Sequence, residues 1–540
     1  MTYLDTLIQF TVLIGGTLGL ATLFGTYIAR LISFEMRPLE KTLAKVESGF
    51  YKLIGIDVTK QMTWKEYFFA LILTNLIVVV FVIVVLTLQN YLPFSQHVKG
   101  LPIDLAFHTA ISFVTDTDLQ HYAGEQQLSN VSQMIAITFT MFVAPASGIV
   151  AAFAFIRSFI RKNFGLGNFY MDFIRVIITM LLPVAFVSSL VLMTIGIPQT
   201  FNSHVTVNTL EGSKQVINTG PVASLVAIKQ LGSNGGGFFG ANSAHPFENP
   251  TGLSNMYEMF LMLVIPLSFP IAYAKLMGKG RGLSILTAML IGFGSLLVIA
   301  FSITSGPSLL ETRFGSFSSV LFNTISLSTN TGAVNSSLLG MSPNAIVSLL
   351  LAMFVQALPG AVGTGMIIMI IYVILTLFIV GLMVGKTPEF MSMKISPKDI
   401  KLAVFIFLIH PVLILIPTVI AFSTGNAQAI IDGKVTPIGY TQTLYEYTSA
   451  AANNGSDYFG SSANTPFWNY STAIVIFLGR YVPLGLMLAI AGSFTLKDRK
   501  EVVEPIKTQG PLFISVLVVI TFLLTALTFF PFLVIGPFSI

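Results

Sequence analysis

The chain has 540 residues, of which 54% are hydrophobic and only 9% are charged, whereas soluble domains carry about 25% charged residues. This composition excludes a soluble globular enzyme, and the absence of cysteine excludes disulfide frameworks, thiolate metal sites and cysteine nucleophiles. The net charge of +5 does not indicate nucleic-acid binding, because Lys and Arg of membrane proteins collect in cytoplasmic loops.

Apolar residues occur in blocks of about 20, the length at which a helix crosses the hydrocarbon core of a bilayer. We predict an all-α polytopic membrane protein with ten transmembrane helices in a lipid bilayer. In chain order they cover residues 4–29, 66–90, 131–156, 170–196, 255–275, 282–303, 344–384, 402–423, 471–493 and 511–532. No positive residue precedes the first apolar run, so we expect this span to be retained rather than cleaved as a signal peptide.

The distribution of basic residues predicts the orientation of these spans. Five alternate loops hold 22 of the 28 Lys and Arg residues. Such loops lie on the cytoplasmic side of a membrane. The sequence therefore predicts that both termini lie outside.

Four outer loops contain a short apolar stretch that runs into a cluster of Gly, Ser, Thr and Asn. Together with their polar clusters, these stretches cover residues 106–120, 222–243, 319–336 and 445–469. The apolar part of each is too short to cross the membrane, which is typical of a re-entrant segment. One such cluster alone would also fit an ordinary outer turn, but four at similar spacing favour re-entrant P-loops.

Irregular backbone at membrane depth is tolerated only where it is buried in protein or lines water. Four re-entrant loops that meet around a central pore satisfy this condition, and rings of carbonyl oxygens form selective cation filters. Asp116, Asp118, Glu125 and Asp457 add negative potential where a cation would approach. We therefore predict a selective cation pathway.

The repeated unit of helix, re-entrant loop and helix divides the chain into six segments. We expect a flanking first helix and cytoplasmic loop (1–65), pore repeats 1 to 4 (66–157, 158–281, 282–401 and 402–500) and a flanking last helix (501–540).

The seventh predicted span has 41 residues, about 60 Å of helix, which is twice what the membrane needs. Pro359, Gly360, Gly363 and Gly365 mark a break near its middle. The break is either a packing kink or a gating loop that crosses the pore beneath the filter.

Arg480 lies well inside the ninth predicted span. A buried Arg at this depth needs a cavity or a partner. Either it extends to the membrane interface, or it faces the pore and reaches the gating loop.

Several segments of the chain resemble the potassium-binding A subunit of the bacterial Kdp potassium-transporting ATPase, in the superfamily of potassium transporters. They are LGSNGGGFFGANSAHPFENPTG (231–252), NTGAVNS (330–336), GAVGTG (360–365), GLMVGKTPEF (381–390) and NNGSDYFGSSANTPFWN (453–469). The resemblance implies a channel-like subunit of the bacterial plasma membrane that binds external K⁺ and passes it toward an ATPase. It implies three partners: a P-type ATPase B subunit, a single-span C subunit and a small F peptide.

The resemblance also assigns residues. It implies a potassium filter made of Thr115, Asp116, Thr117, Asp118, Gln120, Ser233, Asn234, Gly235, Asn330, Thr331, Gly332, Asn453, Asn454 and Gly455. The first filter segment reads TDTDLQ where the family usually has TNTNWQ. The Pro and Gly break matches the gating loop of the family, with Arg480 as a further gating residue.

The chain contains no DKTGT phosphorylation motif, so we expect no catalytic site here and ATP to be used by a partner subunit. Composition alone leaves another interpretation open, a self-sufficient potassium channel or secondary transporter of the same superfamily.

Overall fold

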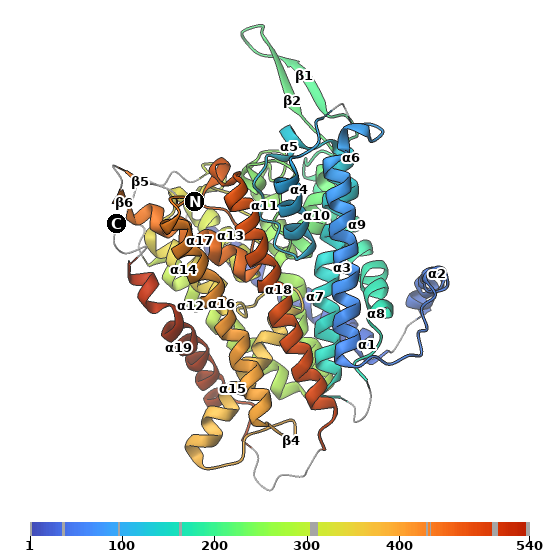
Figure 1. The fold of residues 1–540 in the computed structure, drawn as a ribbon, viewed down its shortest axis with the longest axis vertical. Coiled ribbons are helices and arrows are strands. Elements are labelled where there is room, and N and C mark those ends of the chain that lie inside the picture. Colours follow the sequence, from blue (N-terminus) through green and yellow to red (C-terminus); the bar gives the residue numbers. More distant parts are fainter. Residues whose placement is uncertain are drawn as a thin grey trace.

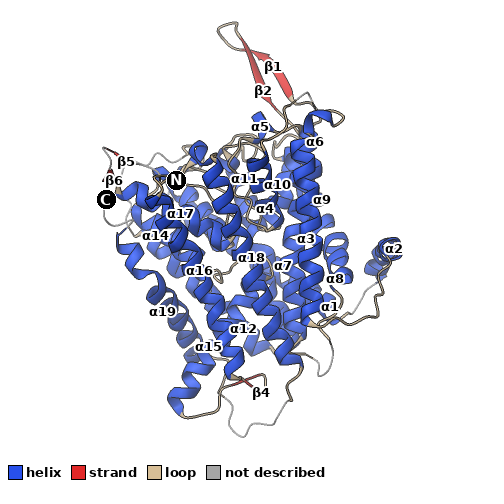
Figure 2. Ribbon diagram, in the orientation of Figure 1, coloured by secondary structure: helices blue, strands red, loops and turns tan. Residues whose placement is uncertain are grey.

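The computed structural model describes residues 3–34, 38–95, 98–160, 165–302, 311–427, 430–431, 434–498 and 506–535. Within these ranges the chain is almost entirely helical (Figure 1, Figure 2). Long helices run side by side along the long axis, and shorter helices lie among them in the upper half of the view.

Nine helical segments of the described residues are long and apolar enough to cross a membrane. They are α1 (Tyr3–Ser33), α3 (Trp64–Thr87), α6 to α7 (Asn130–Arg157), α8 to α9 (Phe169–Thr194), α11 (Gly252–Met277), α12 (Lys279–Phe301), α15 (Thr364–Val384), α16 (Pro397–Ser423) and α18 (Pro466–Thr495). Each corresponds to one of the ten predicted spans. The tenth, predicted at 511–532, falls on α19 (Pro511–Ile535), whose described apolar stretch, Pro511–Ala526, is shorter.

Two of these segments contain a π-helical turn. η2 (Gln133–Thr138) joins α6 (Asn130–Ser132) to α7 (Phe139–Arg157), and η3 (Val176–Leu181) joins α8 (Phe169–Arg175) to α9 (Leu182–Thr194). Such turns interrupt the regular helical hydrogen bonds without ending the helix.

Four short helices have mostly buried side chains. They are α4 (Ile103–Val114), α10 (Val222–Leu231), α13 (Gly315–Ser328) and α17 (Pro437–Ala452). Each lies within one of the predicted re-entrant stretches or overlaps it.

The predicted break in the seventh span is confirmed. α14 (Pro343–Val355) ends at Gln356, which has a left-handed backbone, and α15 begins at Thr364. Residues 356–363 between them form an irregular loop, here called the break loop.

Most of the remaining elements lie at the ends of the bundle, whereas α2 lies at its side (Figure 1). The short helices are α2 (Pro38–Ile54), η1 (Gln89–Tyr91), α5 (Gly124–Gln127), η4 (Asn242–Ala244), η5 (Leu338–Gly340) and η6 (Gly460–Ala463). Three antiparallel pairs are β1 (His204–Asn208) with β2 (Lys214–Asn218), β3 (Glu389–Phe390) with β4 (Met393–Lys394), and β5 (Ile430–Ile431) with β6 (Lys434–Val435). The β1–β2 hairpin projects beyond the helices (Figure 1).

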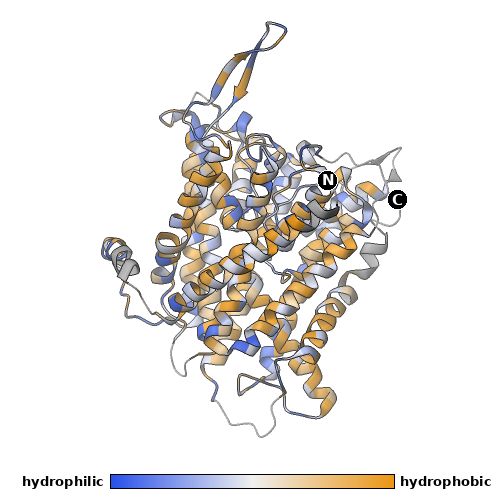
Figure 3. Cartoon of the chain, turned by 180° about the vertical axis from the view of Figure 1, so that it is seen from behind, coloured by the Kyte–Doolittle hydropathy of each residue, from blue (hydrophilic) through white to orange (hydrophobic). Residues whose placement is uncertain are grey.

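Helix starts are specified by local sequence. Thr63, Thr251 and Ser396 cap α3, α11 and α16, each in a reciprocal capping box with the residue three positions later. Hydrophobic residues predominate along the middle of the bundle, and hydrophilic residues are more frequent at its ends (Figure 3). Exposed Phe69 and Phe186 on the long helices fit contact with lipid.

Candidate functional site

The loops that follow the four short helices share one backbone turn. We call them loop 1 (115–120), loop 2 (232–237), loop 3 (329–334) and loop 4 (453–458). The first residue of positive φ in each loop is Asp116 (63°), Ser233 (58°), Asn330 (51°) or Asn453 (54°). The amide of the next residue donates to a carbonyl five positions earlier: Thr117 to Ser112 (3.1 Å), Asn234 to Lys229 (2.9 Å), Thr331 to Ser326 (2.8 Å) and Asn454 to Ser449 (2.9 Å).

The loops touch one another in a closed ring. A Cβ atom added to a glycine would overlap the next loop at Gly235 against the Thr331 carbonyl oxygen, at Gly332 against that of Asn454, and at Gly455 against that of Thr117. A Cβ at Gly236 would lie 3.2 Å from the Cβ of Asp118, which closes the ring. Glycine is needed at these positions because no side chain fits between the loops.

The ring holds backbone oxygens without protein partners. Among the described residues, none donates a hydrogen bond to the carbonyl oxygens of Asp116, Thr117, Ser233, Asn234, Asn330, Thr331, Asn453 or Asn454. All eight residues are at most 7% exposed. Buried carbonyls are normally paired, so this arrangement indicates acceptors reserved for water or a cation.

The amide side chains of the ring join the loops to one another and to neighbouring helices. Asn330 Nδ2 donates to the Ala452 carbonyl oxygen (3.0 Å), and Asn453 Nδ2 donates to Thr117 Oγ1 (2.9 Å). Asn234 Nδ2 donates to the Met141 carbonyl oxygen on α7 (3.0 Å). These amides hold the loops in place.

Gln120 makes a two-point contact with loop 2. Its Nε2 donates to the Gly237 carbonyl oxygen (3.0 Å), and its Oε1 accepts from the Gly237 amide (2.8 Å). Both ends of the Gln120 side chain are thus engaged by protein, which gives this residue a positioning role.

Asp116 and Asp118 of loop 1 face different surroundings. Asp116 Oδ2 lies 3.4 Å from Arg480 Nη2, and both side chains are buried. This ion pair joins loop 1 to α18, and sequence reasoning missed it. Asp118 instead lines the cavity at the mouth of the ring, so only one of the two carboxylates adds negative potential there.

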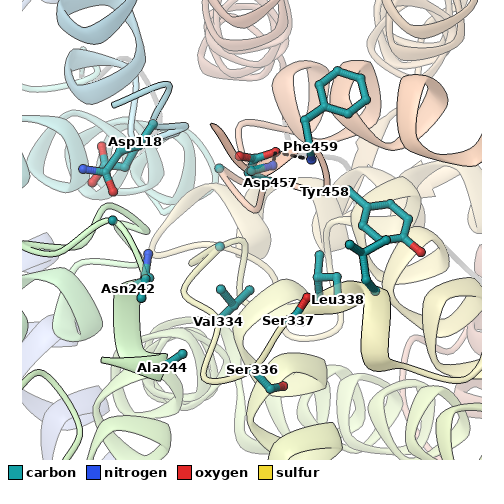
Figure 4. Close-up of a pocket in the computed structure, with 17 residues that line it drawn as sticks. Asp118, Asn242, Ala244, Val334, Ser336, Ser337, Leu338, Asp457, Tyr458 and Phe459 are labelled. Atoms are coloured by element: carbon teal, nitrogen blue, oxygen red, sulfur yellow. Dashed lines mark hydrogen bonds between the residues drawn. The ribbon is translucent and has the colours of Figure 1, made fainter. Parts of the chain in front are cut away.

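The mouth is a cavity of about 330 Å³ lined by loops 1, 3 and 4 and by the chain that follows loops 2, 3 and 4. In Figure 4, Asp118 and Asn242 lie on one side of it, with Asp457 and Val334 farther round. A solute in this cavity meets loops 1, 3 and 4 of the ring and the segment after loop 2.

The break loop packs against the opposite side of the ring. The Gly360 amide donates to the carbonyl oxygen of Ser328 at the end of α13 (2.8 Å). Gly363 has a φ of 78°, and a Cβ there would lie 2.5 Å from the Gly148 carbonyl oxygen of α7. Similarly, a Cβ at Gly365 would lie 2.6 Å from the Pro359 carbonyl oxygen.

Arg480 contacts the break loop only indirectly. Its Nη2 donates to the Ala144 carbonyl oxygen (3.2 Å) as well as to Asp116. A Cβ at Gly148 would lie 3.2 Å from Arg480 Nη2 and 3.0 Å from the Val362 carbonyl oxygen. The Arg480 guanidinium and the break loop therefore both pack against Gly148 of α7.

A small cavity lies between the ring and the break loop. Asn330 and Asn453 line it from the ring, Ala361 and Thr364 from the break region, and Arg480 from α18. Gln356, which the sequence analysis did not single out, also lines it.

Lys229 of α10 was missed by sequence reasoning, although a lysine in a short apolar helix was the available signal. Its buried Nζ donates to Glu248 Oε2 (2.6 Å) and Asn242 Oδ1 (2.5 Å). Asn242 Nδ2 in turn donates to the Gly235 carbonyl oxygen (2.6 Å). Lys229 therefore stabilises loop 2 through Asn242, and the Gly235 carbonyl oxygen already accepts a hydrogen bond from the protein.

Comparison with known proteins identifies the family. A model of the potassium-transporting ATPase A subunit family (KdpA) matches residues 11–539. Among solved structures, the potassium transporter TrkH from Vibrio parahaemolyticus matches with a TM-score of 0.53 and 14% sequence identity, covering 91% of this chain and 100% of that chain. At this identity the likeness to TrkH shows a common fold. Because the family model spans nearly the whole chain, the chain belongs to the potassium-transporting ATPase A subunit family, as the potassium-binding, non-catalytic subunit of the Kdp complex.

Proposed function

We propose that loops 1 to 4 form the potassium selectivity filter of this subunit. The ring of eight buried carbonyl oxygens without protein donors carries the proposal. Selective potassium filters replace the hydration shell of the ion with carbonyl oxygens. Backbone oxygens fulfil this role in the ring, whereas Gln120 and the asparagine amides position the loops.

We also propose that the filter is shared by four pore repeats within a ten-span chain, with the boundaries predicted from the sequence. The order of elements supports this division, because a short buried helix and its loop lie between two long helical segments four times: α3–α4–α7, α9–α10–α11, α12–α13–α15 and α16–α17–α18. α1 and α19 flank these units.

The break loop is proposed as the gate beneath the filter. It borders the cavity under the ring through Ala361 and is bonded to the end of α13 through Gly360. Pro359, Gly360 and Gly363 allow the tight turns of this loop, Gly365 at the start of α15 lets the loop pack closely against that helix, and Arg480 places a positive group beside it.

We infer a sideways route for K⁺ from this cavity toward a partner subunit. His410 of α16 lines the cavity and also a second, mostly apolar cavity of about 280 Å³ between α15, α16 and α19. Two adjoining cavities on this side support docking of a partner membrane domain there.

The proposed partners are a P-type ATPase B subunit, a single-span C subunit and a small F peptide, in a bacterial plasma membrane. The absence of a DKTGT motif from the sequence supports hydrolysis of ATP by a partner. We propose that both termini face outside, which is supported by α1 beginning and α19 ending near the short helices (Figure 1).

Gly332→Ala tests the filter. Gly332 has a φ of 75°, and an added Cβ would overlap the Asn454 carbonyl oxygen, whereas Gly425 has a φ of 72° and open space around it. Gly425→Ala therefore reproduces the backbone strain without the clash. We expect Gly332→Ala, but not Gly425→Ala, to abolish K⁺-stimulated ATPase activity of the assembled complex. Equal K⁺ stimulation in both variants would remove loop 3 from the filter.

A further inference from the structure

The first loop of the ring differs from the other three in its charges. At the position of positive φ, Asp116 corresponds to Ser233, Asn330 and Asn453. Two residues later, Asp118 corresponds to Gly235, Gly332 and Gly455. Loop 1 thus brings two carboxylates into a ring whose corresponding residues are neutral.

The carboxylate of Asp116 has a protein counterion. Its Oδ2 lies 3.4 Å from Arg480 Nη2, with Asp116 2% and Arg480 7% exposed. Removal of one partner of a buried ion pair leaves the other charge uncompensated. Asp116 therefore offsets a positive charge that would otherwise lie close beneath the ring.

The carboxylate of Asp118 has no such counterion. Its Oδ2 accepts a long hydrogen bond from the Gly236 amide (3.5 Å), and its Oδ1 has no hydrogen-bond partner among the described residues. The side chain is 1% exposed and lines the mouth cavity together with Gly332 and Gly455. Lys229, on the α10 helix that precedes loop 2, already forms an ion pair with Glu248.

We propose that Asp118 is a charged ligand of the potassium filter, while Arg480 offsets the charge of Asp116. This inference rests on the proposed filter and specifies its electrostatics. Charge then determines how tightly the ion is held, and the carbonyl ring determines which ion is held.

The test measures the apparent K⁺ affinity of ATPase activity in the purified complex. Asp118→Asn removes the charge and keeps the shape, and we expect K⁺ affinity to fall about tenfold or more while the preference for K⁺ over Rb⁺ and NH₄⁺ is retained. Asp118→Gly gives loop 1 the glycine of the other loops. It serves as the second neutral variant if Asp118→Asn does not assemble. Asp118→Glu keeps the charge and should stay close to the parent affinity.

Asp116→Asn leaves Arg480 unpaired under the ring and should also weaken K⁺ binding. The double variant Asp116→Asn/Arg480→Gln removes both charges and should bind K⁺ more tightly than Asp116→Asn alone. Unchanged K⁺ affinity in the neutral Asp118 variants overturns the ligand role. A double variant no better than Asp116→Asn overturns the role of the ion pair.

Gly332→Ala separates this inference from the proposed filter. If Gly332→Ala loses K⁺ stimulation while the neutral Asp118 variants keep parent affinity, the filter stands and the charge assignment fails. If Gly332→Ala retains K⁺ stimulation, the filter itself fails.

Discussion

The Gly360 amide donates a hydrogen bond to the Ser328 carbonyl oxygen at 2.8 Å. Ser328 is the last residue of α13, directly before loop 3. The break loop is therefore attached to the scaffold of the ring on one side, and through Gly363 it packs against Gly148 of α7 on the other. A change in the break loop is transmitted to the ring by direct contacts.

Deletion of residues 360–365 is expected to open a passive K⁺ leak. The deletion removes the end of the break loop and the start of α15, including Ala361 and Thr364, which border the cavity under the ring, so the proposed barrier below the ring is lost. Flux of K⁺ in proteoliposomes without ATP measures the leak. Gly294→Ala is the control, because a Cβ there meets no atom within 4 Å. A deletion variant that assembles and remains as tight as this control would show that the break is only a packing kink.

Gly235→Asp should lower the apparent K⁺ affinity and weaken the discrimination against Rb⁺ and NH₄⁺. The new Cβ overlaps the Thr331 carbonyl oxygen, so loops 2 and 3 must move apart and change the spacing of the carbonyl ring. Ion-stimulated ATPase activity with each cation checks this. Retention of the parent ion preference would place Gly235 outside the selective part of the ring.

Gln120→Glu should lower K⁺ affinity by about tenfold, the effect of losing 1.4 kcal/mol. A glutamate cannot donate to the Gly237 carbonyl oxygen and would repel it, so the contact between loops 1 and 2 loosens. Gln126→Glu adds the same charge on an exposed residue of α5 and should change little. If both variants lose K⁺ affinity equally, the loss comes from the added surface charge and not from the contact between loops 1 and 2.

Lys229→Met is expected to destabilise the complex by about 3–5 kcal/mol, because it leaves the Glu248 carboxylate buried without its counterion. The thermal midpoint of the purified complex measures the loss. Lys229→Met/Glu248→Gln should recover part of it. Lys214→Met on the exposed β2 strand should leave the midpoint unchanged. A Lys229→Met complex as stable as the Lys214→Met complex would contradict a supporting role for this lysine.

Single cysteines can test the orientation, because the chain contains none. Lys398 is exposed in the first turn of α16 and is a better site than Ser396, whose hydroxyl caps that helix. We expect Leu210→Cys at the tip of the β1–β2 hairpin to react with an impermeant thiol reagent added outside cells. Lys398→Cys should react only after the membrane is permeabilised. The reverse labelling pattern would show that the topology is inverted.

Some properties of the site could be read from local sequence. The four loops are recognisable because each combines a short apolar helix with a run of Gly, Ser, Thr and Asn, and backbone turns depend on such residues within a few positions. The break after α14 is recognisable for the same reason, since Pro359 cannot continue a helix.

Roles of individual side chains could not be read in this way. Asp116 and Arg480 are 364 positions apart, and no local pattern pairs them. The Gln120 side chain carries an amide oxygen that could bind an ion, yet both ends of this amide form hydrogen bonds with the backbone of Gly237. In the sequence Lys229 is an isolated lysine of an outer loop, whereas in the fold it is buried in an ion pair with Glu248.

By itself the sequence determined the membrane-spanning helices, the four loops, the break and the family resemblance, because hydrophobic length and turn chemistry act over neighbouring residues. The tertiary structure alone decided that the loops close into one ring, that Asp116 faces Arg480 and that Asp118 faces the mouth cavity. The physical reason is that these relationships depend on contacts between segments about one hundred or more residues apart, where packing determines which buried polar groups find partners.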